Sequence, residues 1–306
     1  MATRFALQRI ATMVPVLFIV SVAVFMMVHL TPGDPVQMMM GRSGASAEEM
    51  DQVREQLGLN DPLPVQYVHF LSDLATGQAR SIRTQQPVVQ EFLDLFPNTL
   101  ELAIVALVVA TVVGFILGIL SATHQNTWLD SLAMGISLLG ISVPNFWLAL
   151  VLVYVFAISL DWLPATGSKG LESLILPAAV LAVEQVALIA RLVRANMLDA
   201  IQDEYVRTAR AKGLSERAVL IGHALRNALL PTITLLGLNF GYLLGGAVVV
   251  ETVFARPGIG RLIVEGILSK DFPLVQGAIL LTAVVYLLVN LITDISYGFL
   301  DPRVRY

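Results

Sequence analysis

The sequence predicts an all-α integral membrane protein with six transmembrane helices. Of its 306 residues, 56% are hydrophobic and only 14% are charged, and the mean hydropathy is +0.76. A soluble domain carries about 25% charged residues, and six apolar stretches reach the length of about 20 residues that a bilayer span needs. The net charge of −4 gives no basic surface for nucleic acid. The chain has no cysteine, which excludes disulfides and cysteine-ligated metals.

The first predicted span covers residues 10–30 and follows a basic start that carries Arg4 and Arg9 without an acid. A basic start before an apolar run is also typical of a secretory signal peptide. No small-residue cleavage pattern follows this run, and the sequence TPGDP stands at 31–35 instead. We therefore expect an uncleaved transmembrane helix.

The segment between the first two spans, residues 31–99, is acidic, with four Arg against nine Asp and Glu. It is long for a loop, so we expect it to have structure of its own. Helices are predicted at 47–57, where acids come early and Gly58 supplies the stop, at 65–74 and at 87–96.

The other five spans follow from apolar stretches later in the chain. The third stretch has no charge, and Pro144 in its middle predicts a kink, with part of the helix at the membrane interface. The fourth is shorter and contains Glu184. Before the last span, a turn at 256–260 precedes an amphipathic helix at 262–268. The five stretches are 102–122, within 131–160, near 174–190, 228–250 and 274–293.

Basic residues predict the topology, because loops on the cytoplasmic side of a membrane are rich in Lys and Arg. Arg4 and Arg9 precede the first span, Arg303 and Arg305 follow the sixth, and seven Lys and Arg lie at 191–226. Six spans place these three segments on one side, so we expect both termini in the cytoplasm.

The polar stretch 204–231 separates the fourth and fifth spans and predicts a helix, a turn and a second helix. Residues 205–212 favour a helix, Gly213 suits its end with positive φ, and Ser215 suits the next N-cap. The spacing of Ala218, Ile221, Leu225 and Leu229 predicts one face of the second helix, and Pro231 fits the first turn of the helix after it. The stretch lacks a paired acid and base, so it suits docking to a soluble partner better than catalysis.

Several motifs, in order along nearly the whole chain, resemble the membrane subunits of ABC importers for oligopeptides, dipeptides, nickel and glutathione. Within 204–231, Arg207, Thr208 and Ala209 occupy the positions where the general EAA pattern of such loops has Glu-Ala-Ala. Leu225 and Arg226 occupy the positions of its Leu-Pro. Both departures are usual in the peptide branch. The motifs are HLTPGDP at 29–35, LGLNDPL at 57–63, YVRTARAKG at 205–213, HALRNALLP at 223–231, ETVF at 251–254, RPGIGR at 256–261, DFPLVQG at 271–277 and DPRVR at 301–305.

The resemblance implies a type I ABC importer (MetI-like) permease fold. Residues 1–98 would form the first span and a structured external segment, and 99–298 a five-helix core with a coupling loop at 196–230. Residues 299–306 would form a cytoplasmic tail. The chain would be a multi-pass protein of the bacterial cytoplasmic (inner) membrane, surrounded by the lipid bilayer.

The resemblance also implies partners: a second homologous permease subunit, two cytoplasmic ATPase subunits and an extracytoplasmic substrate-binding protein. The chain has no P-loop, so ATP and Mg²⁺ would bind the ATPases, and we expect neither enzymatic activity nor a cofactor on this chain. The expected cargo is small peptides, with glutathione or nickel as alternatives. The implied ATPase-coupling residues are Glu204, Tyr205, Arg207, Thr208, Ala209, Arg210, Ala211, Lys212, Gly213, Leu214 and Ser215.

Candidates for the translocation path are less strongly indicated. Glu184, an acid within a span, is a candidate to bind cargo or to pair with Arg191 or Arg194. A stripe of Gly237, Gly241 and Gly245 indicates close helix packing or a surface that slides against the partner subunit. After Pro144, a kinked segment either lines the path or packs its aromatic rings against neighbours. The path candidates are Asn145, Phe146, Glu184, Asn239, Gly241 and Gly245.

Two other classes of membrane protein have sequence patterns of their own. A stand-alone secondary transporter is typically built from inverted repeats with paired broken helices, and an intramembrane hydrolase needs a Ser–His dyad, an acid pair or a zinc motif. Neither pattern is evident in the sequence. The four His are scattered without metal-ligand spacing, so we expect no metal site.

Overall fold

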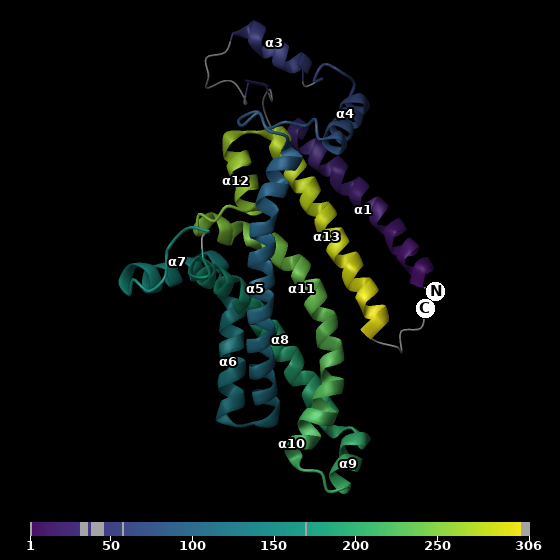
Figure 1. The fold of residues 1–306 in the computed structure, drawn as a ribbon, viewed down its shortest axis with the longest axis vertical. Helices are drawn as coiled ribbons and strands as arrows, with labels where there is room; N and C mark the ends of the chain where they lie inside the picture. Colours follow the sequence, from purple (N-terminus) through teal and green to yellow (C-terminus); the bar gives the residue numbers. More distant parts are fainter. Residues whose placement is uncertain (1, 31–35, 38–45, 57, 169, 301–306) are drawn as a thin grey trace. The chain divides into compact units, whose positions relative to one another are not determined.

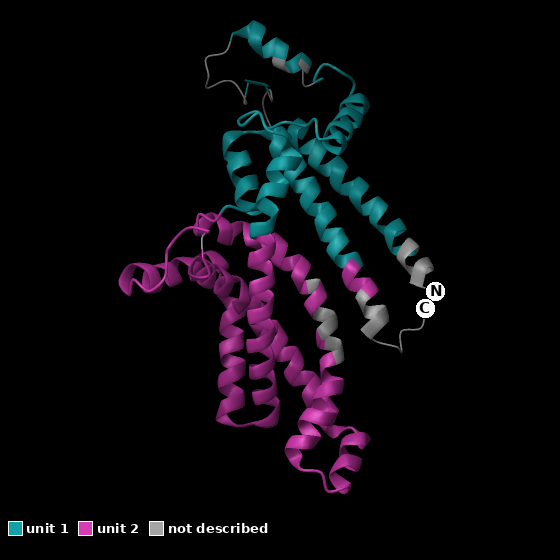
Figure 2. Cartoon of the chain, viewed as in Figure 1, with its two compact units in different colours: residues 1–98, 257–291 teal, residues 99–256, 292–306 magenta. Residues whose placement is uncertain are grey.

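The computed structural model describes residues 2–30, 36–37, 46–56, 58–168 and 170–300. These residues form helices and no β-strand; one isolated bridge joins Arg80 and Pro87 (Figure 1). The chain divides into two compact units, residues 1–98 with 257–291 and residues 99–256 with 292–306 (Figure 2). Residues 257–291, near the end of the chain, group with the N-terminal part.

Four described helices are long and apolar enough to cross a membrane: Gln8–Leu30, Val88–Thr123, Glu172–Gln202 and Phe272–Ile295. The bent pair Trp128–Ser142 and Asn145–Ser159 makes a fifth span if it is counted as one. Helix α11 (Arg226–Val253) occupies the place of the remaining predicted span, and Asn239–Val253 is its apolar described part. The prediction of an all-α membrane protein is confirmed.

The first unit contains the N-terminal helix, the segment after it and two helices from the end of the chain. Its core is a cluster that includes Leu74, Val88, Phe92, Ile259 and Leu274. The Ser81 hydroxyl and the Arg83 backbone N–H donate to the buried Asp271 carboxylate at 2.6 and 3.1 Å. The helices are α1 (Ala2–Leu30), α3 (Ala47–Gln56), α4 (Leu63–Thr76), α12 (Ile259–Ser269) and the larger part of α13 (Phe272–Leu300).

The helix predicted at 87–96 is not a separate element, which corrects the sequence analysis. It forms the first turns of α5 (Val88–Thr123), which continues through Pro97 into the second predicted span. A proline inside a helix removes one backbone hydrogen bond. Here the turns on its N-terminal side are held by the core, because Val88 and Phe92 are buried and the Phe92 ring stacks on Phe96 with centroids 5.8 Å apart.

The third predicted span is broken, as Pro144 suggested. Helix α6 (Trp128–Ser142) ends at Val143, whose φ of −89° and ψ of 122° are extended, as expected for a residue before proline. Helix α7 (Asn145–Leu152) and the π-helix η1 (Val153–Ser159) then continue at 105° to α6.

Helix α8 (Glu172–Gln202) is longer than the stretch near 174–190 that we predicted, and it packs against both α6 and α11. Two glycines of α5 lie against it. A Cβ on Gly118 would lie 2.7 Å from the Ala190 carbonyl oxygen, and one on Gly114 would lie 2.8 Å from the Ile189 side chain. Glycine therefore permits the close approach of α5 and α8.

Candidate coupling site

The short helix α9 (Glu204–Ala211) lies beyond the end of α8, with α10 (Glu216–Val219) after it (Figure 1). The chain leaves α8 at Asp203, which is extended with ψ of 150°. Gly213, between the two short helices, has φ of +78°, a conformation that glycine adopts without steric cost. The Ser215 hydroxyl accepts a hydrogen bond of 3.4 Å from the Ala218 N–H. The predicted helix, glycine turn and serine cap are confirmed.

An ion pair joins the two sides of this turn. The Arg210 guanidinium donates to both carboxylate oxygens of Glu216, over 2.6 Å from Nη2 and 3.0 Å from Nε. These hydrogen bonds lower the pKa of Glu216 and raise the pKa of Arg210. Both side chains are exposed, so solvent screens the attraction. One of the bases expected to contact an ATPase therefore already has a partner in its own chain.

The other face of α9 is buried. Val206 and Ala209 belong to an apolar cluster with Val193, Met197 and Ala200 of α8. The prediction that Ala209 contacts an ATPase is therefore corrected: Ala209 supports α9 from inside. The remaining predicted coupling residues are exposed, and they are Glu204, Tyr205, Arg207, Thr208, Arg210, Ala211, Lys212, Gly213, Leu214 and Ser215.

The second helix of the loop is not a separate amphipathic helix. Its predicted face is partly wrong: Leu225 packs against the buried cluster, but Ala218 is exposed. Helix α10 passes into the π-helix η2 (Leu220–Leu225) and then into α11, so position 231 lies inside a helix and not in its first turn. A π-helix carries more residues per turn than an α-helix, and the buried positions are Val219, Ala224 and Ala228. Ile221, expected on the buried face, is 57% exposed.

Asp130 and Arg194 form a second ion pair, which the sequence analysis missed. Arg194 on α8 donates from Nε and Nη2 to the two oxygens of Asp130, each over 2.8 Å. Ser121 of α5 also donates to Asp130, as does the Asn126 backbone N–H over 3.0 Å. Asp130 is only 5% exposed. The ion pair links the turn between α5 and α6 to α8. Its Arg194 lies about two helical turns before the end of α8.

Glu184 lies on α8 opposite α11. The Tyr242 hydroxyl donates to its two oxygens over 3.3 and 3.5 Å. The suggested ion pair with Arg194 is not formed, because Arg194 binds Asp130. Arg191 makes no ion pair with it either; seven residues on, it is about 10 Å away along the axis.

The other path candidates divide into buried and open positions. Asn239 and Gly241 of α11 are buried, whereas a Cβ on Gly245 would meet no atom within 4 Å. A Cβ on Gly237 would clash with Thr293, so this part of the stripe packs within the chain. Phe146 is 54% exposed, so its ring does not pack fully against neighbours within this chain. Asn145 beside it is half-buried.

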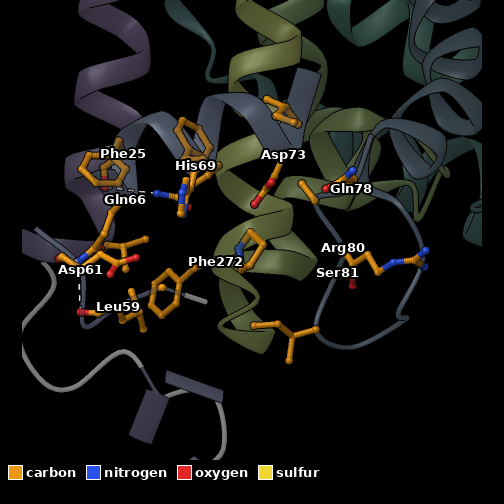
Figure 3. A pocket seen from close by; sticks show the side chains of 18 of the residues that line it. Phe25, Leu59, Asp61, Gln66, His69, Asp73, Gln78, Arg80, Ser81 and Phe272 are labelled. Atoms are coloured by element: carbon orange, nitrogen blue, oxygen red, sulfur yellow. Dashed lines mark hydrogen bonds between the residues drawn. The ribbon is translucent and has the colours of Figure 1, made fainter. Parts of the chain in front are cut away.

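A pocket of about 590 Å³ lies in the first unit, between α1, α4, the loop at 77–87 and the start of α13 (Figure 3). Its lining mixes apolar and polar residues, and the polar ones include His69, Asp73 and Arg80. His29 Nε2 donates to Gln66 Oε1 over 3.0 Å, and Gln66 Nε2 donates to the carbonyls of Leu59 and Asp61. Residues far apart in the sequence meet here, which explains why the sequence analysis assigned them no role.

Comparison with known proteins places the chain in a family. Residues 114–306 match the family model "Binding-protein-dependent transport system inner membrane component", and residues 2–103 match the model of the corresponding N-terminal region. The chain belongs to this family of ABC importer permeases. The permease is accordingly a multi-pass inner-membrane protein, and the resemblance inferred from its motifs is confirmed.

Curated relatives match the permease over its full length. It is 42% identical over 303 residues to the glutathione transport system permease protein GsiC of Escherichia coli (strain K12), with 99% of each chain covered. The identity and coverage are the same for the protein of that name from Shigella dysenteriae serotype 1 (strain Sd197).

Solved structures share the fold of the permease. It superposes with a TM-score of 0.60 on a chain of the MetNI methionine ABC transporter in an inward-facing conformation, covering 70% of the permease and 98% of that chain at 18% identity. The TM-score is 0.54 with an amino acid ABC transporter crystallised with histidines, covering 71% and 95% at 15% identity. The type I ABC importer fold is therefore confirmed.

Proposed function

We propose that this permease is one of two membrane subunits of an ATP-driven importer for short peptides, and that α9 and the Gly213 turn couple it to separate ATPase subunits. The observation that carries the proposal is the two-sided construction of α9. Its Val206 face is buried against α8, while Arg207 and Lys212 on the other side are exposed. An element rigidly joined to the core and open to a partner can transmit that partner's movement.

The proposed mechanism is alternating access. When ATP closes the two ATPases on each other, the helix bound by each one moves inward. Helix α8 tilts with it because α9 packs on α8, and α11 follows because α9 also packs on η2, which continues into α11. The Asp130–Arg194 ion pair carries the same movement to α5 and α6. A ligand such as ATP shifts the balance between inward-facing and outward-facing states only through its different affinity for the two.

For this mechanism the coupling loop must face the ATPases, so we place it and both termini in the cytoplasm. The segment 31–98 then lies outside the membrane, where an extracytoplasmic binding protein delivers the cargo.

Glutathione is the second candidate cargo. The 42% identity over the whole chain to glutathione permeases favours it, and glutathione is itself a small peptide. Nickel remains the alternative with a different chemistry.

The test is uptake by lipid vesicles that contain this permease with its partner permease and ATPases. Radiolabelled dipeptide, glutathione and Ni²⁺ are supplied with the binding protein outside and ATP inside. We expect ATP-dependent uptake of a peptide or of glutathione, and none when the ATPases are omitted. Ion-driven uptake by the permease alone would overturn the proposal in favour of a secondary transporter.

A further inference from the structure

Glu184 is a carboxylate placed where a membrane helix can least easily carry one. It lies in the apolar part of α8, about 18 Å along the axis from Glu172 and about 10 Å from Arg191 at 1.5 Å per residue. A Glu side chain cannot span that distance to reach the membrane surface. Charge at this depth costs several kcal/mol unless it is paired or hydrated.

The rest of the described chain does not neutralise this charge. Its hydrogen-bond donor among the described residues is the Tyr242 hydroxyl, at 3.3 Å or more. One hydroxyl leaves most of the acceptor capacity of a carboxylate unused, since its two oxygens accept about four hydrogen bonds. Two amide side chains on the same helices also lack hydrogen bonds. Gln185 Oε1 on α8 and Asn239 Nδ2 on α11 are buried without a hydrogen-bond partner among the described residues.

The face that carries Glu184 is open in this chain. Glu184 is half-buried, Tyr242 is 53% exposed, and space lies beyond Gly245 one helical turn further along α11. Lipid is a poor cover for this face, because hydrocarbon offers a carboxylate neither a hydrogen bond nor a counter-charge. A water-filled path between the two membrane subunits satisfies both needs.

We propose that Glu184 lines the translocation path and binds a cationic group of the cargo within the membrane. An ammonium group has three N–H donors and a positive charge, which match the free lone pairs and the charge of Glu184. Peptides and glutathione carry such a group, and a metal cation such as Ni²⁺ also carries positive charge. The inference rests on the proposed function and adds a point of contact with the cargo inside the membrane.

The test separates charge from shape in the reconstituted complex. Glu184→Gln keeps the size and removes the charge, Glu184→Asp keeps the charge and shortens the side chain, and Glu172→Gln makes the same change in the first turn of α8. We expect Glu184→Gln to lower cargo uptake per ATP hydrolysed about tenfold. Glu184→Asp should keep at least a third of it, and Glu172→Gln should match the wild type.

A second pair of variants leaves Glu184 unchanged. These variants test the inference even if the Glu184 variants do not assemble into the complex. Tyr242→Lys places an ammonium beside the carboxylate in place of the cargo, and Tyr242→Gln is its uncharged control. We expect cargo uptake per ATP hydrolysed to fall about tenfold in Tyr242→Lys and less than threefold in Tyr242→Gln.

The cargo decides which cation is bound. A loss with a dipeptide or glutathione but not with Ni²⁺ indicates the ammonium group, and the reverse indicates the metal ion. Three results would overturn the inference. The first two are wild-type uptake by Glu184→Gln and a larger loss of uptake in Glu184→Asp than in Glu184→Gln. The third is a loss in Glu184→Gln that is equally large for a dipeptide and for its N-acetylated form, which lacks the ammonium group. The failure of the proposed function is a separate outcome, in which the wild-type complex itself shows no ATP-dependent uptake.

Discussion

Arg194 of α8 donates two parallel N–H···O hydrogen bonds of 2.8 Å each to Asp130 at the start of α6. The geometry is bidentate and the carboxylate is buried, which distinguishes this pair from an exposed ion pair of small effect. It joins the α5–α6 hairpin to the helix that leads into α9. Rigidity at this point is what a coupling element requires.

We expect Asp130→Asn to destabilise the permease by about 3 kcal/mol, since removing one partner leaves the other charge without compensation. Thermal unfolding of the purified protein in detergent measures the effect. The double variant Asp130→Ala with Arg194→Ala should lose less than the sum of the two single variants. Simple additivity would show that the two residues do not interact.

Gly213→Pro should abolish ATP-dependent uptake while the protein remains in the membrane. Proline fixes φ near −65°, and Gly213 has φ of +78°, so the angle between α9 and α10 must change. Gly222→Ala is the matched control, because Gly222 lies in a helix and a Cβ there meets no atom within 4 Å. Normal uptake by the proline variant would contradict a role for this turn.

Arg210→Glu should reduce uptake strongly, because it opposes two carboxylates across the Gly213 turn. The swap of Arg210→Glu with Glu216→Arg restores the ion pair in the reverse order. If the pair serves to hold the turn, we expect the swap to recover most of the uptake and of the binding to ATPases in a pull-down. Recovery of neither would mean that Arg210 itself contacts the ATPase.

The pH dependence of this ion pair follows from the lowered pKa of Glu216. A carboxylate with a lowered pKa in the folded state contributes stability above its ordinary pKa, which is about 4.3 for Glu. That contribution is lost as the pH falls through the lowered value. We therefore expect Glu216→Gln to shift the thermal midpoint equally at pH 6 and pH 8. A difference between these two pH values would contradict it.

Gly118→Leu should destabilise the permease by about 1–3 kcal/mol, the usual effect of overpacking. Its Cβ would lie 2.7 Å from the Ala190 carbonyl oxygen, so α5 must move away from α8. Gly135 of α6 is the control, because a Cβ there meets no atom within 4 Å. Equal thermal midpoints for Gly118→Leu and Gly135→Leu would contradict the close packing.

The comparison of sequence and structure is clearest in the coupling loop. The helix, the positive φ of Gly213 and the cap at Ser215 were predictable, because each depends on residues within one or two turns. The burial of Ala209 and the exposure of Ile221 were not predictable from the sequence. Both depend on how α9 and η2 meet α8, and the π-helix shifts the buried face against the predicted 3.6-residue period.

The sequence by itself determined the membrane class, the positions of the apolar helices, the break at Pro144 and the family, because hydropathy and short motifs are local properties. Only the tertiary structure decided that Asp130 binds Arg194, that Glu184 faces Tyr242 and that α5 runs unbroken through Pro97. These outcomes depend on contacts between segments distant in the chain, and a charged residue does not specify in its own sequence neighbourhood which partner it will reach.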